Sequence, residues 1–185
     1  MITTEIIKQC KDGDRKGQYA LYKLLAPKMM AVCLRYLRNK EDAEDALQVA
    51  FVKIFKYIHT FNFSGPFPAW SRRIVVGVAI DHYHKKNKNK IIQYEDNNES
   101  SSLNHPSDEN ILASFDANEL LEILNKLPES FRLILNLYAI EGYAHKEIAE
   151  MLQISEGTSR SQLSRARAML TEQCYPKVKI LQHGV

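Results

Sequence analysis

The sequence contains little cysteine, and its three cysteines are poorly placed to form a covalent or metal-linked scaffold. Cys10, Cys33 and Cys174 are odd in number and widely spaced, and no Cys-x-x-Cys pair occurs in the 185 residues. This spacing supports neither a disulfide framework nor a zinc site. We therefore predict a protein that folds without structural disulfides, metal or another cofactor.

Long apolar runs are also missing. The longest, residues 74–80, includes Gly77, whereas a membrane-spanning helix needs about 20 apolar residues. Residues 1–10 lack the basic stretch and apolar core of a secretory signal. These absences predict a cytoplasmic protein with no membrane insertion.

Glycine and proline are sparse, with 7 and 6 residues, and β-branched residues rarely alternate with polar ones. The apolar fraction of 45% is ordinary for a globular chain and excludes wholesale disorder. Helical spacing of apolar residues dominates instead. The predicted fold class is therefore all-α, in one domain or two small ones.

Three helices are expected in the N-terminal half of the chain. The first covers residues 20–37 and is interrupted by Pro27. Asn39 is the expected N-cap of the second, because acidic residues follow it and favour the positive end of a helix. Residues 60–69 hold one glycine, two prolines and three phenylalanines, so helix is expected to resume only at Trp70. The second helix should bury a stripe made of Ala43, Leu47, Ala50, Phe51, Ile54, Phe55 and Ile58.

Charge is unevenly distributed along the chain, although the total is only +3. Residues 1–68 carry a net +4 and residues 69–90 a net +5, whereas residues 91–125 carry eight acidic groups and no lysine or arginine. Residues 93–110 are also rich in asparagine and serine, and they have too few apolar side chains to offset the chain entropy lost on folding. We predict an acidic linker between two small helical domains.

The C-terminal half has the pattern of a helix-turn-helix. Pro128 is expected to open a helix that ends at Gly142. A short helix over residues 145–152 and a tight turn follow, and Ser155 is the expected N-cap of a helix over residues 156–170. The residues expected to face inward are Phe131, Ile134, Leu135, Tyr138, Ile148, Ala149, Leu152, Leu163, Ala166 and Leu170.

The last of these helices is expected to turn hydrogen-bond donors outward. Arginine can donate two hydrogen bonds to one guanine, and serine or glutamine can reach bases or phosphate oxygens in the major groove. This face therefore predicts duplex DNA binding. The residues expected on it are Arg160, Ser161, Gln162, Ser164, Arg165 and Arg167.

Two further surfaces precede the linker. Residues 60–90 combine aromatic rings with a cationic run, a combination typical of proteins that bind single-stranded or melted DNA. Asp42, Asp45 and Gln48 lie three residues apart and share a helix face suited to docking a partner helix.

An enzyme is the less favoured alternative. A metal-dependent hydrolase would use Asp81, His82 and His84 as its metal ligands. However, His82 and His84 are two residues apart and do not share a helix face. No His-Glu-x-x-His, phosphate loop or nucleophile elbow is present. We predict no catalytic residue, no metal site and no small-molecule substrate.

Together these motifs resemble a bacterial RNA polymerase sigma factor of the sigma-70 family, of the extracytoplasmic-function (ECF) type. The helix that binds core polymerase in this family is similar to RYLRNKEDAEDALQVAFVKIFKYIHTF. The promoter-melting loop and minus-10 recognition helix are similar to SGPFPAWSRRIVVGVAIDHYHKK, and the minus-35 helix-turn-helix domain to LPESFRLILNLYAIEGYAHKEIAEMLQISEGTSRSQLSRARAML. The resemblance covers residues 21–170 in the family's order.

The resemblance implies four segments. Residues 1–92 form the region 2 domain, which binds core polymerase and recognises and melts the minus-10 element, and residues 93–112 form the acidic linker. Residues 113–175 form the region 4 helix-turn-helix domain, which recognises the minus-35 element, and residues 176–185 a tail. The linker passes toward the RNA exit path in this family, where its carboxylates would mimic RNA electrostatically.

The resemblance also assigns contacts to individual residues. Those implied to bind core polymerase are Asp42, Asp45, Leu47, Gln48 and Phe51. Those implied to bind minus-10 DNA are Ser64, Phe67, Trp70, Arg72, Arg73, Asp81, His84 and Lys85. Those implied to bind minus-35 DNA are Lys146, Thr158, Arg160, Ser161, Ser164 and Arg165, with Lys146 and Thr158 near phosphates. At three positions the chain departs from residues common in the family: Gly77 replaces Asn, His84 replaces Arg, and Ser159 replaces Val.

The implied partners are core RNA polymerase, promoter DNA (duplex at minus-35 and a melted strand at minus-10) and an anti-sigma factor. The competing hypothesis is a stand-alone helix-turn-helix regulator that binds an operator as a dimer without polymerase. Such a regulator would need neither the aromatic and basic segment nor the face that carries Asp42, Asp45 and Gln48.

Overall fold

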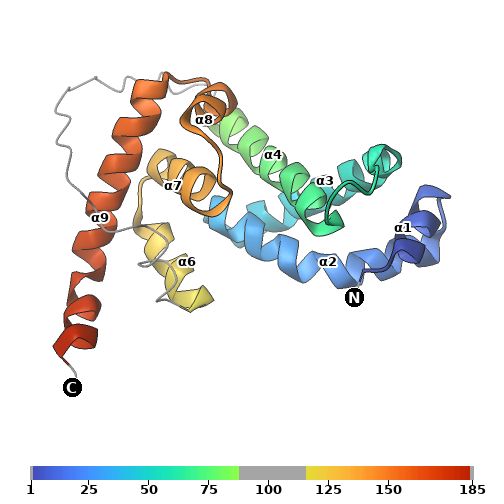
Figure 1. Cartoon of the computed structure of the whole chain (residues 1–185), viewed down its shortest axis with the longest axis horizontal. Helices are drawn as coiled ribbons and strands as arrows, with labels where there is room; N and C mark the ends of the chain where they lie inside the picture. The colour runs from blue at the N-terminus through green and yellow to red at the C-terminus, as the bar shows by residue number, and fades with distance from the viewer. Residues whose placement is uncertain (1, 88–115, 184–185) are drawn as a thin grey trace. The chain divides into compact units, whose positions relative to one another are not determined.

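A computed structural model of the chain describes residues 2–87 and 116–183, with the backbone alone for residues 87, 117, 118, 120 and 173–183. Every regular element in these two ranges is a helix, and no strand occurs in them, which confirms the predicted all-α class (Figure 1). The chain divides into two compact units, Met1–Ile91 and Ile92–Val185. The predicted linker, residues 93–112, lies outside the described residues.

The N-terminal unit is built from three mutually packed helices, α2 (Arg15–Tyr36), α3 (Lys40–Tyr57) and α4 (Phe67–Asn87). A short helix α1 (Thr4–Lys11) packs on α2, and a 3-10 turn η1 (Ile58–Thr60) lies between α3 and α4. The three long helices share one apolar core. Its fully enclosed side chains include Leu21, Leu25, Tyr36, Ala43, Ala50, Ile54, Val75, Val76 and Ala79.

The prediction that Pro27 interrupts the first long helix is wrong. Helix α2 begins at Arg15 and continues through Pro27 to Tyr36. Pro27 is exposed, whereas Leu25 and Met29 on either side of it are buried. Because these flanking side chains are anchored in the core, the helix tolerates the loss of the backbone hydrogen bond that proline cannot donate.

Helix α4 begins three residues earlier than the predicted Trp70. Phe67 and Pro68 form its first turn, where a proline needs no intrahelical hydrogen bond. Its buried side is wide and includes Val75, Val76, Val78, Ala79 and Ile80, because α4 packs against both α2 and α3.

The N-cap of α3 is as predicted. The Asn39 side chain accepts a hydrogen bond from the Glu41 backbone N–H at 2.9 Å. The apolar stripe that follows is also confirmed, except that Phe55 is only half-buried.

Replacing Asn39 by Ala should lower the free energy of unfolding of the N-terminal unit by about 1 kcal/mol, because an orphan amide at the helix start loses its acceptor. Trp70, the only tryptophan, reports on this unit, so urea unfolding followed by its fluorescence measures the change. Asn39→Ser retains an acceptor and is the matched control. Equal losses in the two variants would show that the cap contributes nothing.

The C-terminal unit contains α6 (Ala117–Lys126), α7 (Glu129–Leu135), a π-helical turn η2 (Asn136–Ile140), α8 (His145–Leu152) and α9 (Glu156–His183). Helix α8 has the predicted bounds, and Ser155 caps α9 by accepting from the Thr158 N–H at 2.9 Å. Gly142 ends the preceding helix with φ +78°, a left-handed conformation that glycine adopts without strain. The helix-turn-helix is therefore confirmed.

Three details of this unit differ from the predictions. Phe131 is half-buried, and the neighbouring Leu133 is buried. Tyr138 is exposed and Leu137 buried, because the wider turn η2 changes the helical register around these two residues. Gln162, expected outward, is buried beside Leu163. Helix α9 continues past Leu170 to His183, so residues 176–183 of the predicted tail are helical.

Cys10 and Cys33 are buried thiols. Burial raises the pKa of each to about 11, with a smaller contribution from Asp14 at Cys10. Both are thus fully protonated near neutral pH and poorly reactive. Cys174 lies in the part of α9 that is described by its backbone alone.

Among the helices in the described ranges, none has a stretch long and apolar enough to cross a membrane. In the same ranges, no group of three or more His, Cys, Asp or Glu side chains could hold a metal ion.

Candidate docking and nucleic-acid interfaces

Helix α3 exposes one continuous face to solvent. Asp45, Gln48, Val49 and Val52 are spaced i, i+3, i+4 and i+7, so they follow one another along one side of the helix. Val49 is 49% exposed and Val52 67%. We call these four residues the docking face. It places one carboxylate and one amide beside two apolar side chains that are about half and two-thirds exposed among the described residues.

Two residues predicted to bind polymerase are not on this face. Leu47 is 8% exposed and Phe51 only 4%, because both belong to the apolar stripe that packs on α2. The Phe51 ring lies 4.6 Å from the Tyr22 ring of α2 and 5.9 Å from the Phe55 ring, measured between centroids.

Asp42 lies at the edge of α3 nearest α4. Its carboxylate is 3.6 Å from His82 Nε2, an ion pair when the imidazole is protonated. Asp42 therefore bridges two helices and is only partly available to a partner.

Sequence reasoning missed Val49 and Val52. A signal was present, because both are apolar yet fall outside the buried stripe and continue the spacing that starts at Asp45. Exposed apolar side chains next to polar ones are typical of protein interfaces.

The segment between η1 and α4 forms a loop of residues 61–66, which we call the capture loop. Its tip is an Asx turn in which the Ser64 N–H donates to the Asn62 side-chain oxygen at 3.1 Å. Phe63 has φ +61°, a left-handed conformation that is uncommon for a residue with a side chain, and its ring is 45% exposed. The loop thus presents Phe63 and Ser64 to solvent.

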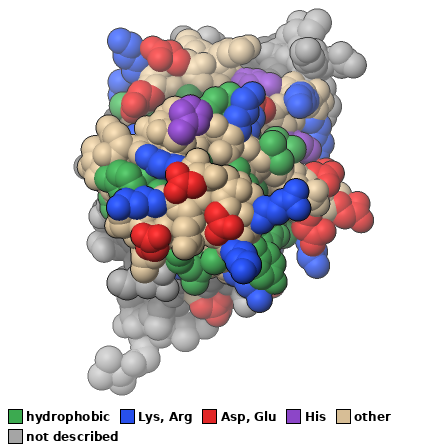
Figure 2. Space-filling model, turned by 90° about the vertical axis from the view of Figure 1, so that its right-hand side faces the viewer, with side chains coloured by type: hydrophobic (Ala, Val, Ile, Leu, Met, Phe, Trp, Pro, Cys, Tyr) green, Lys and Arg blue, Asp and Glu red, His purple; other side chains and the backbone are tan. Residues whose placement is uncertain are grey.

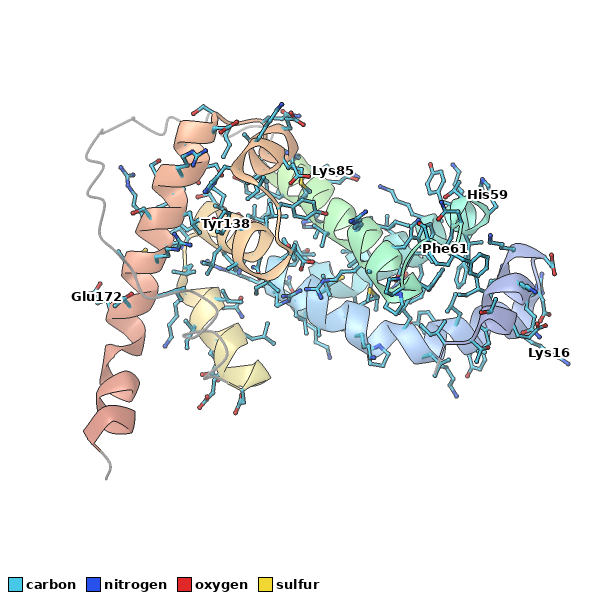
Figure 3. The ribbon with its side chains drawn as sticks, in the orientation of Figure 1. Lys16, His59, Phe61, Lys85, Tyr138 and Glu172 are labelled. Carbon is cyan, nitrogen blue, oxygen red and sulfur yellow. The ribbon has the colours of Figure 1, made fainter. Side chains whose placement is uncertain are left out.

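Aromatic rings anchor the base of this loop. The Phe61 ring lies 5.0 Å from Phe63, 5.1 Å from Phe67 and 5.6 Å from Trp70, and in Figure 3 Phe61 is seen within this group of rings. Phe67 is buried, so the expectation that it contacts DNA does not fit its position: it packs edge-on against Phe61 and fixes the loop. Trp70 is half-buried, and Phe63 is the exposed ring.

Helix α4 carries five of the expected minus-10 residues beyond its first turn. Arg73, Asp81 and Lys85 are exposed, whereas Arg72 and His84 are half-buried. The Asp81 carboxylate forms a 2.9 Å ion pair with Lys53 of α3. A Cβ atom built at Gly77 would meet no atom within 4 Å, so this position leaves open space between Arg73 and Asp81.

The proposed hydrolase residues are not brought together. Asp81 pairs with Lys53, and His82 approaches Asp42. The His84 ring lies against Tyr83, with 5.7 Å between ring centroids. The three side chains therefore contact three different residues and do not converge on one site.

The outer face of α9 carries the residues expected at the major groove. Arg160, Ser161 and Arg165 are exposed and Ser164 is half-buried, at spacings that keep them on one side of the helix. Arg160 forms a 3.2 Å ion pair with Glu156. Lys146, at the start of α8, is exposed, and Thr158 shares a 2.8 Å hydrogen bond with Ser155.

Comparison with known families assigns both units. The family model "Sigma-70 region 2" matches residues 21–89, and "Sigma-70, region 4" matches residues 117–170. The ECF RNA polymerase sigma factor SigW of Bacillus subtilis is 29% identical over 181 residues, which is 94% of this chain and 97% of that protein. The ECF RNA polymerase sigma-E factor of Haemophilus influenzae is 26% identical, covering 92% and 94%. The chain belongs to the sigma-70 family and is a sigma factor of the ECF type.

The fold of the sigma factor is also similar to a solved one. The structure of CnrH in complex with the cytosolic domain of CnrY matches 92% of this chain and 96% of that chain, with 20% identity and a TM-score of 0.50. The docking face, the capture loop and α4 all fall within the region 2 match, and α8 with the first half of α9 falls within region 4. Helix α1 precedes the matched residues.

Ser159 gives this sigma factor a polar contact inside its helix-turn-helix. Ser159 is fully buried, and its Oγ lies 2.9 Å from Nδ1 of His145, the first residue of α8. The His145 ring stacks on Tyr138 with 4.7 Å between centroids, and Arg167 lies 5.5 Å from the Tyr138 ring (Tyr138 is labelled in Figure 3). The Ser at this position thus joins α8 to α9 by a hydrogen bond, whereas the valine common in the family could make only an apolar contact.

The pKa of His145 lies below 6.5, because burial disfavours the charged ring and the nearby Arg160 and Arg167 repel it, with Glu156 acting in the opposite direction. The unfolded chain therefore takes up a proton at a higher pH than the folded chain. We expect the free energy of unfolding to fall as the pH is lowered through 6.5 and to level off below the pKa of the folded state.

An NMR titration of the His145 imidazole checks the pKa directly. The stability is checked by urea unfolding followed by circular dichroism between pH 7.5 and pH 5, values chosen to bracket about 6.5. His145→Gln cannot titrate and is the control. An equal loss of stability on acidification in His145→Gln would assign the effect to other groups.

Proposed function

We propose that the chain binds core RNA polymerase, directs it to specific promoters and helps open the minus-10 region so that transcription starts. Sigma factors are transcription initiation factors, and the presence of both matched regions in one chain supports this function. The observation that carries the proposal is the docking face of α3. A stand-alone DNA-binding regulator would have no need for two exposed valines beside Asp45 and Gln48.

The first step is docking on polymerase. Val49 and Val52 supply apolar area that becomes buried, and Asp45 and Gln48 supply polar contacts at the rim. The supporting side chains, Leu47 and Phe51, are held in the core beneath, so the face is rigid before it binds.

The second step is capture of the unpaired minus-10 strand. Stacking of a base on an exposed aromatic ring is worth about 1–3 kcal/mol, which offsets the few kcal/mol needed to unstack the base from the duplex. Phe63 offers such a ring, and Arg73 and Lys85 on α4 supply cations for the strand's phosphates. Ser64 and Gly77 would let a base or sugar approach closely, since Ser64 is exposed and Gly77 has no side chain.

The third step is reading the minus-35 duplex. Helix α9 would lie in the major groove with Arg160, Ser161, Ser164 and Arg165 toward the base edges. Lys146 and Thr158 would contact phosphates, which fix the register of the helix without reading sequence.

We further propose that the chain is not an enzyme in its own right and that it acts in the cytoplasm, where the polymerase is. An anti-sigma factor would hold it inactive by covering surfaces that polymerase needs, among them the docking face. This last proposal follows from the family alone.

Transcription in vitro tests the proposed function. Purified chain is combined with bacterial core RNA polymerase and a library of templates whose promoter region is randomised, and the 5′ ends of the RNA products are sequenced. We expect initiation only when the chain is present, and only on templates that share one element near minus-10 and one near minus-35. The proposal is wrong if core polymerase neither binds the chain nor gains promoter-dependent initiation. Binding of a dimer to an operator without polymerase would support the stand-alone regulator.

A further inference from the structure

Helix α1 contacts the capture loop, although it lies outside the residues that match the family. It packs on α2 and on η1, immediately before the loop. In Figure 1 it lies beside the turn that leads into α4. The face seen from that side has apolar side chains interspersed with basic and acidic ones (Figure 2).

Lys11, the last residue of α1, makes the decisive contacts. Its Nζ donates a 2.6 Å hydrogen bond to the backbone carbonyl oxygen of Phe61, a residue 50 positions later in the sequence. The same Nζ lies 4.8 Å from the centroid of the Phe63 ring, within the range of a cation–π interaction. One ammonium group therefore holds the backbone at the base of the loop and the ring at its tip.

The loop needs such support. Phe63 has φ +61°, and a residue with a side chain keeps this conformation only where its surroundings enforce it. Within the loop, the Ser64 N–H donates to the Asn62 side-chain oxygen, an Asx turn that shapes the tip but does not attach it to the rest of the unit. Backbone hydrogen bonds attach the two ends of the loop, from the Phe61 N–H to the Ile58 carbonyl oxygen and from the Ala69 N–H to the Pro66 carbonyl oxygen. Between these ends, the Phe61 ring and Lys11 contact the Phe63 ring.

Helix α1 also forms one wall of a groove beside the loop. The groove has a volume of about 590 Å³ and is lined by Ile7 of α1, Leu24 and Lys28 of α2, and Phe63 and Pro66 of the loop.

We propose that Lys11 is a positioning residue for promoter opening: it holds the capture loop so that the exposed part of the Phe63 ring is presented to the unpaired strand. This inference rests on the proposed function, and it extends the minus-10 site to α1. Lys11 acts through Phe61 and Phe63 and need not touch DNA. An ordered loop binds a strand more tightly than a mobile one, because the entropy of ordering has been lost before binding.

The first experiment measures the loop itself. Lys11→Met preserves an unbranched side chain but removes the charge and the donor. We expect chymotrypsin to cleave after Phe63 several times faster in this variant than in the wild type, with the cut site identified by mass spectrometry, because cleavage requires the loop to open. Lys8→Met is the matched control, since Lys8 is exposed on the same helix and its side chain points to solvent. Lys11→Arg restores a cationic donor and should restore slow cleavage.

The second experiment measures promoter opening. Open complexes are quantified by permanganate reactivity of unpaired thymines, on a promoter selected from the randomised library and with wild-type or variant chain bound to core polymerase. We expect Lys11→Met to reduce the open complex about tenfold, the loss expected for one charge-assisted hydrogen bond and its ring contact. Lys8→Met should have no effect, Lys11→Arg should recover most of the loss, and binding to core polymerase should stay constant in all variants.

The outcomes separate the two proposals. Faster cleavage together with fewer open complexes in Lys11→Met, both reversed by Lys11→Arg, supports the positioning role. Faster cleavage with unchanged opening, or reduced opening with unchanged cleavage, overturns it. If the wild-type chain itself fails to initiate at any promoter, the proposed function is wrong, and the cleavage rates still decide whether Lys11 fastens the loop.

Discussion

Replacing Val52 by Asp is expected to lower the affinity of the chain for core RNA polymerase by about 100-fold. Val52 is two-thirds exposed, at 67%, so the change costs the free chain little. In the complex the new carboxylate would be buried against a partner without a pairing cation, and desolvating an unpaired charge costs several kcal/mol. Binding is measured by fluorescence anisotropy of labelled chain titrated with core polymerase.

Ala168→Asp is the matched control for this prediction. Ala168 is exposed on α9, so the substitution adds the same charge to a helix surface outside the docking face. It should leave the affinity for core polymerase unchanged, as should the free energy of unfolding in both variants. The double variant Asp45→Arg with Gln48→Ala tests the polar half of the same face. Retained binding in both the Val52 and the Asp45/Gln48 variants would show that polymerase docks elsewhere.

Replacing Arg165 by Ala is expected to cost about 1–3 kcal/mol of binding free energy at the selected minus-35 element, a factor of about 5 to 150 in affinity. Arg165 is exposed on the outer face of α9, where a guanidinium can donate two hydrogen bonds to one guanine. The loss should be specific: templates with a scrambled minus-35 element should bind the variant and the wild type alike.

Lys146→Ala provides the contrast. Lys146 is exposed at the start of α8, where it is expected near a phosphate, so its loss should weaken binding about equally on every sequence and reduce the salt dependence by about one counterion. Both variants are compared by electrophoretic mobility shift of the holoenzyme at several salt concentrations. Equal weakening by Arg165→Ala on all sequences would make Arg165 a phosphate anchor as well.

Features that depend on neighbouring residues were predictable from the sequence. Asn39 and Ser155 cap their helices as expected, because a cap needs only a side-chain oxygen within three residues of the amides it accepts from. Gly142 ends a helix because its φ is positive. Helix α8 and its inward residues Ile148 and Leu152 followed from spacing alone, since one side of a short helix is buried.

Features that depend on packing were less predictable. Spacing located the buried stripe of α3, and Leu47 and Phe51, which the resemblance assigns to polymerase binding, are buried in that stripe and not on the docking face. The same packing leaves Val49 and Val52 uncovered. Gln162 was expected on the outer face and is buried for a similar reason. The number of helices packed around a helix decides how wide its buried side is, and the sequence of that helix alone does not specify this number.

The sequence by itself determined the helical class, the order of the two matched regions and the caps that begin α3 and α9, because these follow from local chemistry and a pattern that extends over most of the chain. Only the tertiary structure decided which side chains of α3 reach solvent and that Lys11 fastens a loop 50 residues away. Both depend on which helices pack together, and that packing is set by the burial of apolar area summed over the whole unit rather than by any one segment.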